Sequence, residues 1–170
     1  MVITTINRDV DMKVLAIDPG NIESAYVLYE DNKPTKYDYV PNEMLAHMLE
    51  ELEADHMAIE MIASYGMPVG KTVFETCVWI GRFIQIWEEL GRTHSKIYRM
   101  DVKMHLCHSM RAKDANIRQA LLDRFEPTGG GKTPQLGTKS QPGPLYGVSG
   151  DMWAALAVAV TYADKESRRC

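Results

Sequence analysis

Short apolar runs alternate along this chain with longer stretches in which apolar residues recur at helical spacing. Residues 13–18, 25–30 and 36–40 are short apolar or alternating runs separated by turn residues, which is typical of neighbouring antiparallel strands. Two further apolar runs, at 56–60 and 95–99, lie among stretches of helical periodicity. A meander followed by strands that alternate with helices predicts an α/β domain in which helices flank a mixed five-stranded sheet.

Helical spacing predicts the remaining elements. After the third strand, one apolar face is formed by Met44, Leu45, Met48, Leu49 and Leu52. Pro41 suits the first turn of that helix, and Gly91 suits the end of the next one. The predicted helices cover residues 43–54, 72–90, 101–110, 112–125 and 149–164.

The predicted elements divide the chain into one domain, a loop and two ends. Residues 13–165 are long enough for a single domain with its own core. Residues 1–12 are expected to be a flexible extension, and residues 166–170 a tail. Residues 127–147 form a long loop rich in Gly, Pro, Ser and Thr, and a loop of that length inside a compact domain usually has a function.

The net charge of −4 conceals a basic block in the second half of the chain. Residues 92–139 contain ten Lys or Arg and only four acidic residues. Phosphate binding needs a local positive surface and not a positive total, so the block is compatible with a nucleic-acid-binding protein. A set of solvated helix faces is the alternative interpretation.

Cysteine usage and hydropathy indicate the compartment. Cys77, Cys107 and Cys170 are odd in number and have no CxxC spacing, which favours reduced thiols in the cytoplasm. The cluster of Cys107 and His108 with His105 is too irregular for a zinc site. No apolar run approaches 18 residues and the N-terminus has no apolar signal core, so we expect neither a membrane span nor a signal peptide.

Three carboxylates are the candidates for catalysis. Asp18 ends the first predicted strand, Glu60 ends the fourth, and Asp151 opens the last helix, where it would also serve as an ordinary helix cap. Acids at the ends of buried strands need a partner, and Mg²⁺ or Mn²⁺ is the natural one for oxygen ligands. Two such ions about 3.5–4 Å apart can stabilise both the attacking water and the leaving oxygen of a phosphodiester.

These acids lie in motifs that resemble a known family. Similarity to RuvC-type Holliday junction resolvases appears, in chain order, at residues 17–20 (IDPG), 58–60 (AIE), 101–103 (DVK) with 112–118, and 150–159 (GDMWAALAVA). The loop 129–147 resembles a phage branch of that family. The resemblance spans about residues 13–165, and its specificity comes from the order and spacing of motifs that are individually weak.

The resemblance implies an RNase H-like fold, a homodimer and symmetric nicking of four-way and other branched DNA. It implies that Asp18, Glu60 and Asp151 bind two Mg²⁺ or Mn²⁺ ions, and that a basic residue near Lys103 or Lys113 meets the scissile phosphate. We take Lys113 as the catalytic candidate. The expected location is the cytoplasm of a bacterial host, with a role in phage replication or packaging.

One position departs from the family pattern. A second acid commonly follows the first by three residues on the last helix, and this chain has Ala154 there. Three carboxylates suffice in this branch, or another acid such as Asp164 substitutes, or Ala154 is an inactivating change. Asp164 lies about three helical turns away and is the weakest of these interpretations.

DNA contacts are expected from Lys103, Arg111, Lys113, Arg118, Lys132, Lys139 and Tyr65. Residues 129–133 (GGGKT) lack the first glycine of a phosphate-binding loop, so no nucleotide cofactor is expected. A mobile DNA-contacting loop is the functional interpretation of this region, and a plain flexible connector is the alternative. Tyr65 would stack on an opened base, or else pack against the next helix.

Two other functions use the same residues. An RNase H-type enzyme would cut the RNA strand of hybrids with the same carboxylates. A catalytically disabled protein would bind branched DNA without turnover, as Ala154 suggests. An actin-like ATPase fragment also opens with an acid-glycine turn, but 170 residues are too few for its two lobes.

Overall fold

The computed structural model describes residues 12–169, so all of the predicted extension except Met12 lies outside the described residues. Met12 packs against the core. The elements are β1 (Val14–Asp18), β2 (Glu23–Glu30), β3 (Lys33–Pro41), α1 (Asn42–Met48), β4 (His56–Met61), α2 (Lys71–Glu89), β5 (Thr93–Tyr98), α3 (Arg99–Cys107), α4 (Asp114–Arg124) and α5 (Met152–Ser167).

The five strands form the single mixed sheet that the sequence predicted, and their order is β3-β2-β1-β4-β5. β1, β2 and β3 pair antiparallel as a meander, whereas β4 pairs parallel with both β1 and β5. β1 is central, and its residues Val14, Leu15, Ala16 and Ile17 are all 0% exposed. A strand buried on both faces explains why residues 14–17 are apolar without alternation.

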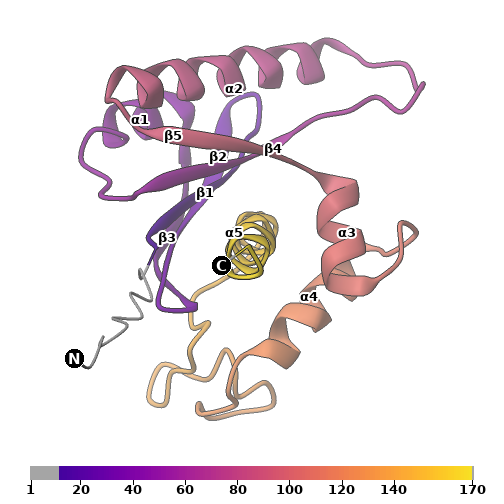
Figure 1. Cartoon of the computed structure of the whole chain (residues 1–170). Helices are drawn as coiled ribbons and strands as arrows, with labels where there is room; N and C mark the ends of the chain where they lie inside the picture. The colour runs from indigo at the N-terminus through magenta and orange to yellow at the C-terminus, as the bar shows by residue number, and fades with distance from the viewer. Residues whose placement is uncertain (1–11, 170) are drawn as a thin grey trace, which may run out of the picture.

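Helices cover both faces of the sheet (Figure 1). Val14 and Ala16 of β1 face the core layer formed with α5, and Leu15 and Ile17 face the layer formed with α1 and α2. The α5 face of the sheet is packed by a helix whose residues 155–160 are fully buried and mostly small. Small side chains let the helix lie close to the strands.

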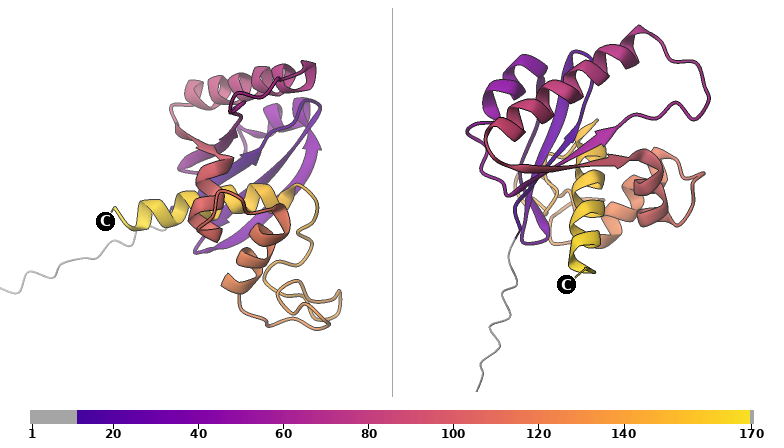
Figure 2. Two further views of the ribbon diagram at one scale, coloured as in Figure 1. Left: turned by 90° about the vertical axis from the view of Figure 1, so that its right-hand side faces the viewer. Right: turned by 45° about the horizontal axis from the view of Figure 1, so that its top comes forward.

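α5 lies between the sheet and a second group of segments made of α3, α4 and the loop before α5 (Figures 1 and 2). Asp164 of α5 ties this group together, because it accepts hydrogen bonds of 2.7 Å from both His105 Nε2 of α3 and Arg124 of α4. The Tyr37 hydroxyl of β3 donates to the carbonyl of Tyr146 and so attaches the loop to the sheet. The position of α5 is therefore fixed from both sides.

Several predicted helix bounds were wrong. α3 ends at Cys107 and not at residue 110, and α5 begins at Met152 and not at residue 149. α1 ends at Met48, not at residue 54. The carbonyls of Leu49 and Leu52 accept hydrogen bonds from Arg92 Nη1, at 3.2 and 2.8 Å, so a distant side chain and not a continuing helix binds them. At the other end of the chain, α5 continues to Ser167, so the predicted tail begins inside a helix.

The long loop predicted at 127–147 contains no helix or strand, but it is folded on itself. Gly137 and Pro142 form an isolated antiparallel bridge. Gly129 and Gly143 approach neighbouring backbone so closely that an added Cβ would collide with it. Leu145 is 0% exposed and anchors the loop in the core layer shared with α5. None of the helices in the described part of the chain is long and apolar enough to span a membrane.

Candidate functional site

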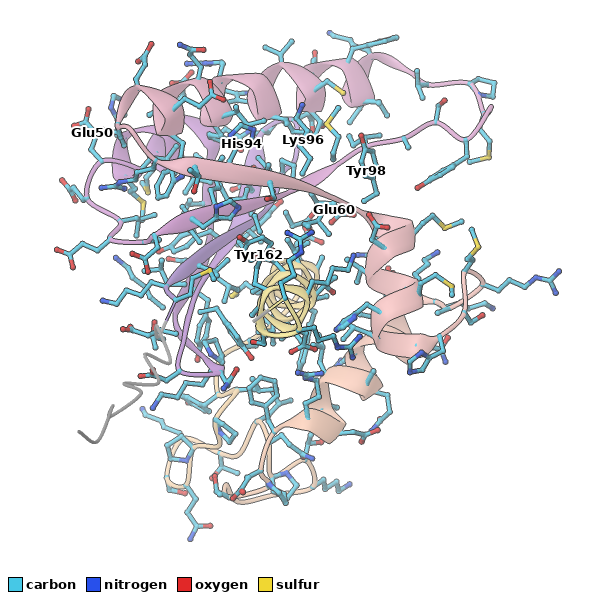
Figure 3. The ribbon with its side chains drawn as sticks, in the orientation of Figure 1. Glu50, Glu60, His94, Lys96, Tyr98 and Tyr162 are labelled. Carbon is cyan, nitrogen blue, oxygen red and sulfur yellow. The ribbon has the colours of Figure 1, made fainter. Side chains whose placement is uncertain are left out.

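Asp18 and Glu60 are brought together by strand pairing. β1 and β4 are parallel neighbours with Ile17 opposite Ile59, so the next residue of each strand lies at the same edge of the sheet. Because side chains alternate, both acids point to the face opposite these isoleucines, which is the face covered by α5. Figure 3 shows Glu60 at the end of β4, near the start of α3.

A closed hydrogen-bond ring holds the turn that follows Asp18. The Gly20 N–H donates to Ser24 Oγ (3.1 Å), Ser24 Oγ donates to Asn42 Oδ1 (2.6 Å), and Asn42 Nδ2 donates back to the Gly20 carbonyl (2.9 Å). Ser24 and Asn42 are 0% and 1% exposed. An added Cβ at Gly20 would collide with the Glu23 carbonyl, which explains the glycine of the IDPG motif.

The two acids open into a pocket of about 250 Å³ that also receives residues from α3, α4 and α5. All three predicted carboxylates are in its wall. The pocket is lined by Asp18, Glu60, Arg99, Asp114, Ile117, Arg118, Gly150, Asp151, Trp153 and Ala154.

The strand-end carboxylates destabilise each other when both are charged. Burial, and then the negative charges of Glu60 and Asp151, raise the pKa of Asp18 from 3.8 to about 8, although the positive charge of Arg99 opposes the shift. Burial likewise raises the pKa of Glu60, again against Arg99. Two carboxyl groups in this setting need either a proton or a cation.

One oxygen of this pair has no hydrogen-bond partner. Glu60 Oε2 is buried and accepts no hydrogen bond from any described residue. Arg99 Nη1 is the cation beside it, but at 4.0 Å it is beyond hydrogen-bond distance. A buried carboxylate oxygen without a donor is free to coordinate a cation, and oxygen is the donor that Mg²⁺ and Mn²⁺ prefer.

Asp151 lies at the rim of the pocket and is exposed. It precedes α5, but its side chain makes no capping hydrogen bond, so the ordinary helix-cap interpretation does not describe it. Within residues 12–169, no three His, Cys, Asp or Glu side chains stand in the arrangement of a metal site. The donors therefore fit a divalent ion at Asp18 and Glu60, and Asp151 would have to turn inward to join them.

Ala154 places only a methyl group in the pocket wall, on the first turn of α5. Asp164 does not replace the missing acid, because it is engaged with His105 and Arg124. That interpretation was wrong, since residue 164 lies far along α5 and faces the packing between helices.

Two solved structures share this arrangement of elements. The structure of RuvC from Thermus thermophilus is 15% identical, with 89% of this chain and 93% of that chain covered and a TM-score of 0.63. T. thermophilus RuvC in complex with a Holliday junction substrate is 16% identical, with the same coverage of 89% and 93% and a TM-score of 0.64. No family model and no curated protein sequence matches this chain.

The chain has a RuvC-like fold. This confirms the predicted RNase H-like α/β class, and the five-stranded sheet with flanking helices is the shared feature. At 15–16% identity the likeness concerns the fold and not the reaction.

Two basic residues, Arg99 and Arg118, line the pocket together with the carboxylates. Arg118 of α4 stacks over the Trp153 ring at 4.9 Å. Arg99 was missed as a site residue, although it follows β5 at the edge where β1 and β4 end. Its position immediately after the fifth predicted strand is the sequence feature that could have identified Arg99 as a site residue. Lys113 immediately precedes α4 and is exposed, but it is not among the residues that line the pocket.

The other predicted DNA contacts lie outside the pocket. Lys103 is half-buried on α3, and Arg111 is exposed between α3 and α4. Lys132 and Lys139 are exposed on the folded loop. Tyr65 is 59% exposed in the loop after β4, so packing against α2 does not bury it.

Proposed function

We propose that this chain is a metal-dependent, structure-selective endodeoxyribonuclease that resolves four-way and other branched DNA by paired nicks. The observation that carries the proposal is the buried Asp18–Glu60 pair, with one carboxylate oxygen left without a donor. Such a pair is stabilised by divalent cations. The substrate class rests on the RuvC-like fold together with the Holliday junction in the T. thermophilus complex.

Asp18 and Glu60 would hold the two Mg²⁺ or Mn²⁺ ions, with Asp151 turning inward from the rim as a third ligand. When bound, such ions lower the pKa of water and stabilise the leaving oxygen of a phosphodiester. Arg118 would bind a DNA phosphate, because its stacking on Trp153 holds the guanidinium at the mouth of the pocket.

Phosphates farther from the cut would be bound by cations of the helices and the loop. We assign this role to Lys103, Arg111, Lys132 and Lys139, and a base-stacking role to Tyr65. Lys113 differs from these residues, because it adjoins Asp114 of the pocket wall. It stays our candidate for contact with the scissile phosphate.

A catalytically disabled, branched-DNA-binding protein is the second candidate. Two observations favour it: Ala154 contributes no acid to the pocket wall, and Asp151 stands exposed at the rim. Such a protein would bind junctions through the same basic surface without cutting them.

Paired nicks require two sites related by a two-fold axis, so we propose that the chain forms a homodimer. We also propose that it acts in the cytoplasm. Phe74 and Val78 lie one turn apart on α2 and are 61% and 62% exposed, which suits a surface covered by a second copy. We expect Phe74→Glu to convert a dimer into a folded monomer in light scattering after size-exclusion chromatography. A wild-type chain that is monomeric at micromolar concentration, with and without DNA, would contradict the dimer.

The deciding experiment incubates the protein with a labelled four-way junction, a linear duplex and an RNA–DNA hybrid, each with Mg²⁺, Mn²⁺ or EDTA. We expect metal-dependent paired nicks in the junction that disappear in Asp18→Asn. Junction binding without cutting, with cutting gained in Ala154→Asp, would establish the disabled protein. Preferential cutting of the hybrid would establish an RNase H-type enzyme, and no preference for the junction at all would overturn the resolvase proposal.

A further inference from the structure

Asp114 is an acid in the pocket wall that the proposed reaction does not use. It is the first residue of α4, and its side chain is 87% exposed. Its carboxylate oxygen Oδ1 accepts a direct hydrogen bond from Arg99 Nη2. The same guanidinium points its other amino group, Nη1, toward Glu60 Oε2 at 4.0 Å. Arg99 therefore stands between two carboxylates and is bonded to only one of them.

The unequal sharing has a consequence for Glu60. A charge-assisted hydrogen bond between a guanidinium and a carboxylate has a length of about 2.7–2.9 Å. Arg99 would need to move by only about 1 Å to make such a bond with Glu60 Oε2, starting from 4.0 Å. The hydrogen bond between Arg99 and Asp114 opposes this movement. Glu60 Oε2 has no hydrogen-bond partner among the described residues, although a cation is close by.

A guanidinium and a divalent ion compete for the same carboxylate oxygen. If Arg99 closed onto Glu60, the buried pair would be well satisfied in a poorly solvated pocket, and a metal ion would have to break it. We propose that Asp114 is a positioning residue that holds Arg99 away from Glu60 and so keeps Glu60 able to bind a divalent ion. This inference rests on the metal site of the proposed function.

Direct metal binding by Asp114 is the rival explanation. The contacts favour the positioning role, because the carboxylate is bonded to Arg99 and most of the side chain faces solvent. The two explanations differ in their dependence on Arg99. A metal ligand acts whether or not the arginine is present, whereas a positioning residue acts only through it.

The test is a double-mutant cycle on Mn²⁺ affinity, measured without DNA by the electron paramagnetic resonance signal of free Mn²⁺ at one pH. We expect Asp114→Asn to weaken binding by about tenfold, the effect of one charge-assisted hydrogen bond. In the Arg99→Gln background the same substitution should change affinity by less than about twofold. An equal loss in both backgrounds, or no loss in the wild-type background, would overturn the proposal.

Two controls separate this proposal from the proposed function. Asp123→Asn removes an equivalent exposed charge from the same helix without touching the pocket, and should leave Mn²⁺ affinity unchanged. Asp18→Asn should abolish the tight site. If wild type and Asp18→Asn bind Mn²⁺ alike, the metal site itself is refuted and this inference falls with it. If only the cycle fails, the metal site stands. Thermal unfolding of each variant checks that it is folded.

Discussion

The strand-end acids and the acid before α5 enter the same pocket but are held in different ways. Asp18 and Glu60 are set by the pairing of β1 with β4, are largely buried, and have raised pKa values. Asp151 is exposed and is positioned by the docking of α5 and the loop before it. The sheet thus supplies the buried half of the candidate site, and the start of α5 supplies its exposed half.

The largest expected effect is the difference in cleavage rate between variants that each lack one acid, from the sheet or from the rim. We expect Asp18→Asn to reduce junction cleavage by at least about a thousandfold, because it removes an acid from the buried pair. Asp151→Asn should cost less, about ten- to a hundredfold, since the buried pair remains. Single-turnover cleavage rates at saturating Mg²⁺ measure both. Equal losses of cleavage rate in the two variants would show that the rim acid and the sheet acid contribute equally to cleavage.

The pH dependence of the free energy of unfolding tests the raised pKa of the strand-end acid Asp18. The pKa of Asp18 is raised from 3.8 to about 8, so the folded chain binds this proton more tightly than the unfolded chain. The acid therefore destabilises the metal-free protein above pH 8, and the penalty disappears as pH falls toward 3.8.

Asp18→Asn should accordingly be more stable than wild type at high pH, by on the order of a few kcal/mol, with the difference shrinking on acidification. Urea unfolding of both proteins in EDTA across this range gives the difference directly. A difference that is constant with pH would mean that Asp18 titrates normally.

The turn after Asp18 tests how rigid the sheet half must be. Asn42→Ala leaves the buried Ser24 hydroxyl without its acceptor and the part-buried Gly20 carbonyl without its donor, so we expect a loss of about 1–3 kcal/mol in the free energy of unfolding. Mn²⁺ affinity should fall as well, because the turn carries the backbone of Asp18. Asn21→Ala is the matched control, since its side chain makes only a part-buried hydrogen bond of 3.3 Å to Glu75 and lies outside the ring. Unaltered stability in Asn42→Ala would refute the role of the ring.

The smallest effect on DNA binding is expected from a substitution in the folded loop. Lys139→Ala should weaken junction binding about two- to fivefold and lower the dependence of log affinity on log salt by about one phosphate contact. Lys33→Ala, on the exposed start of β3, is the control and should change neither. Fluorescence anisotropy with a labelled junction at several salt concentrations provides both quantities.

Much of the fold followed from local patterns, because strand ends are marked by acids and turn residues. Asp18 and Glu60 could be placed from apolar runs that stop at an acid, and the parallel pairing then made them neighbours. The end of α1 could not be placed, because Arg92 binds the carbonyls of Leu49 and Leu52 from 43 and 40 positions away. The positions of Arg99 and Asp114 in the pocket wall could not be predicted either, because they depend on how α3 and α4 pack.

The α/β class, the strands of the sheet and the two acids at its carboxyl edge could therefore be derived from the amino-acid order, since period-two and period-3.6 patterns report directly on which face is buried. Tertiary structure alone decided that Asp164 binds His105 and Arg124, that Asp151 stays at the rim, and that Arg99 joins Asp114 while standing 4.0 Å from Glu60. Those relations join charged side chains from different elements. Long charged side chains carry no periodic signal, and only the packed helices set which of them meet.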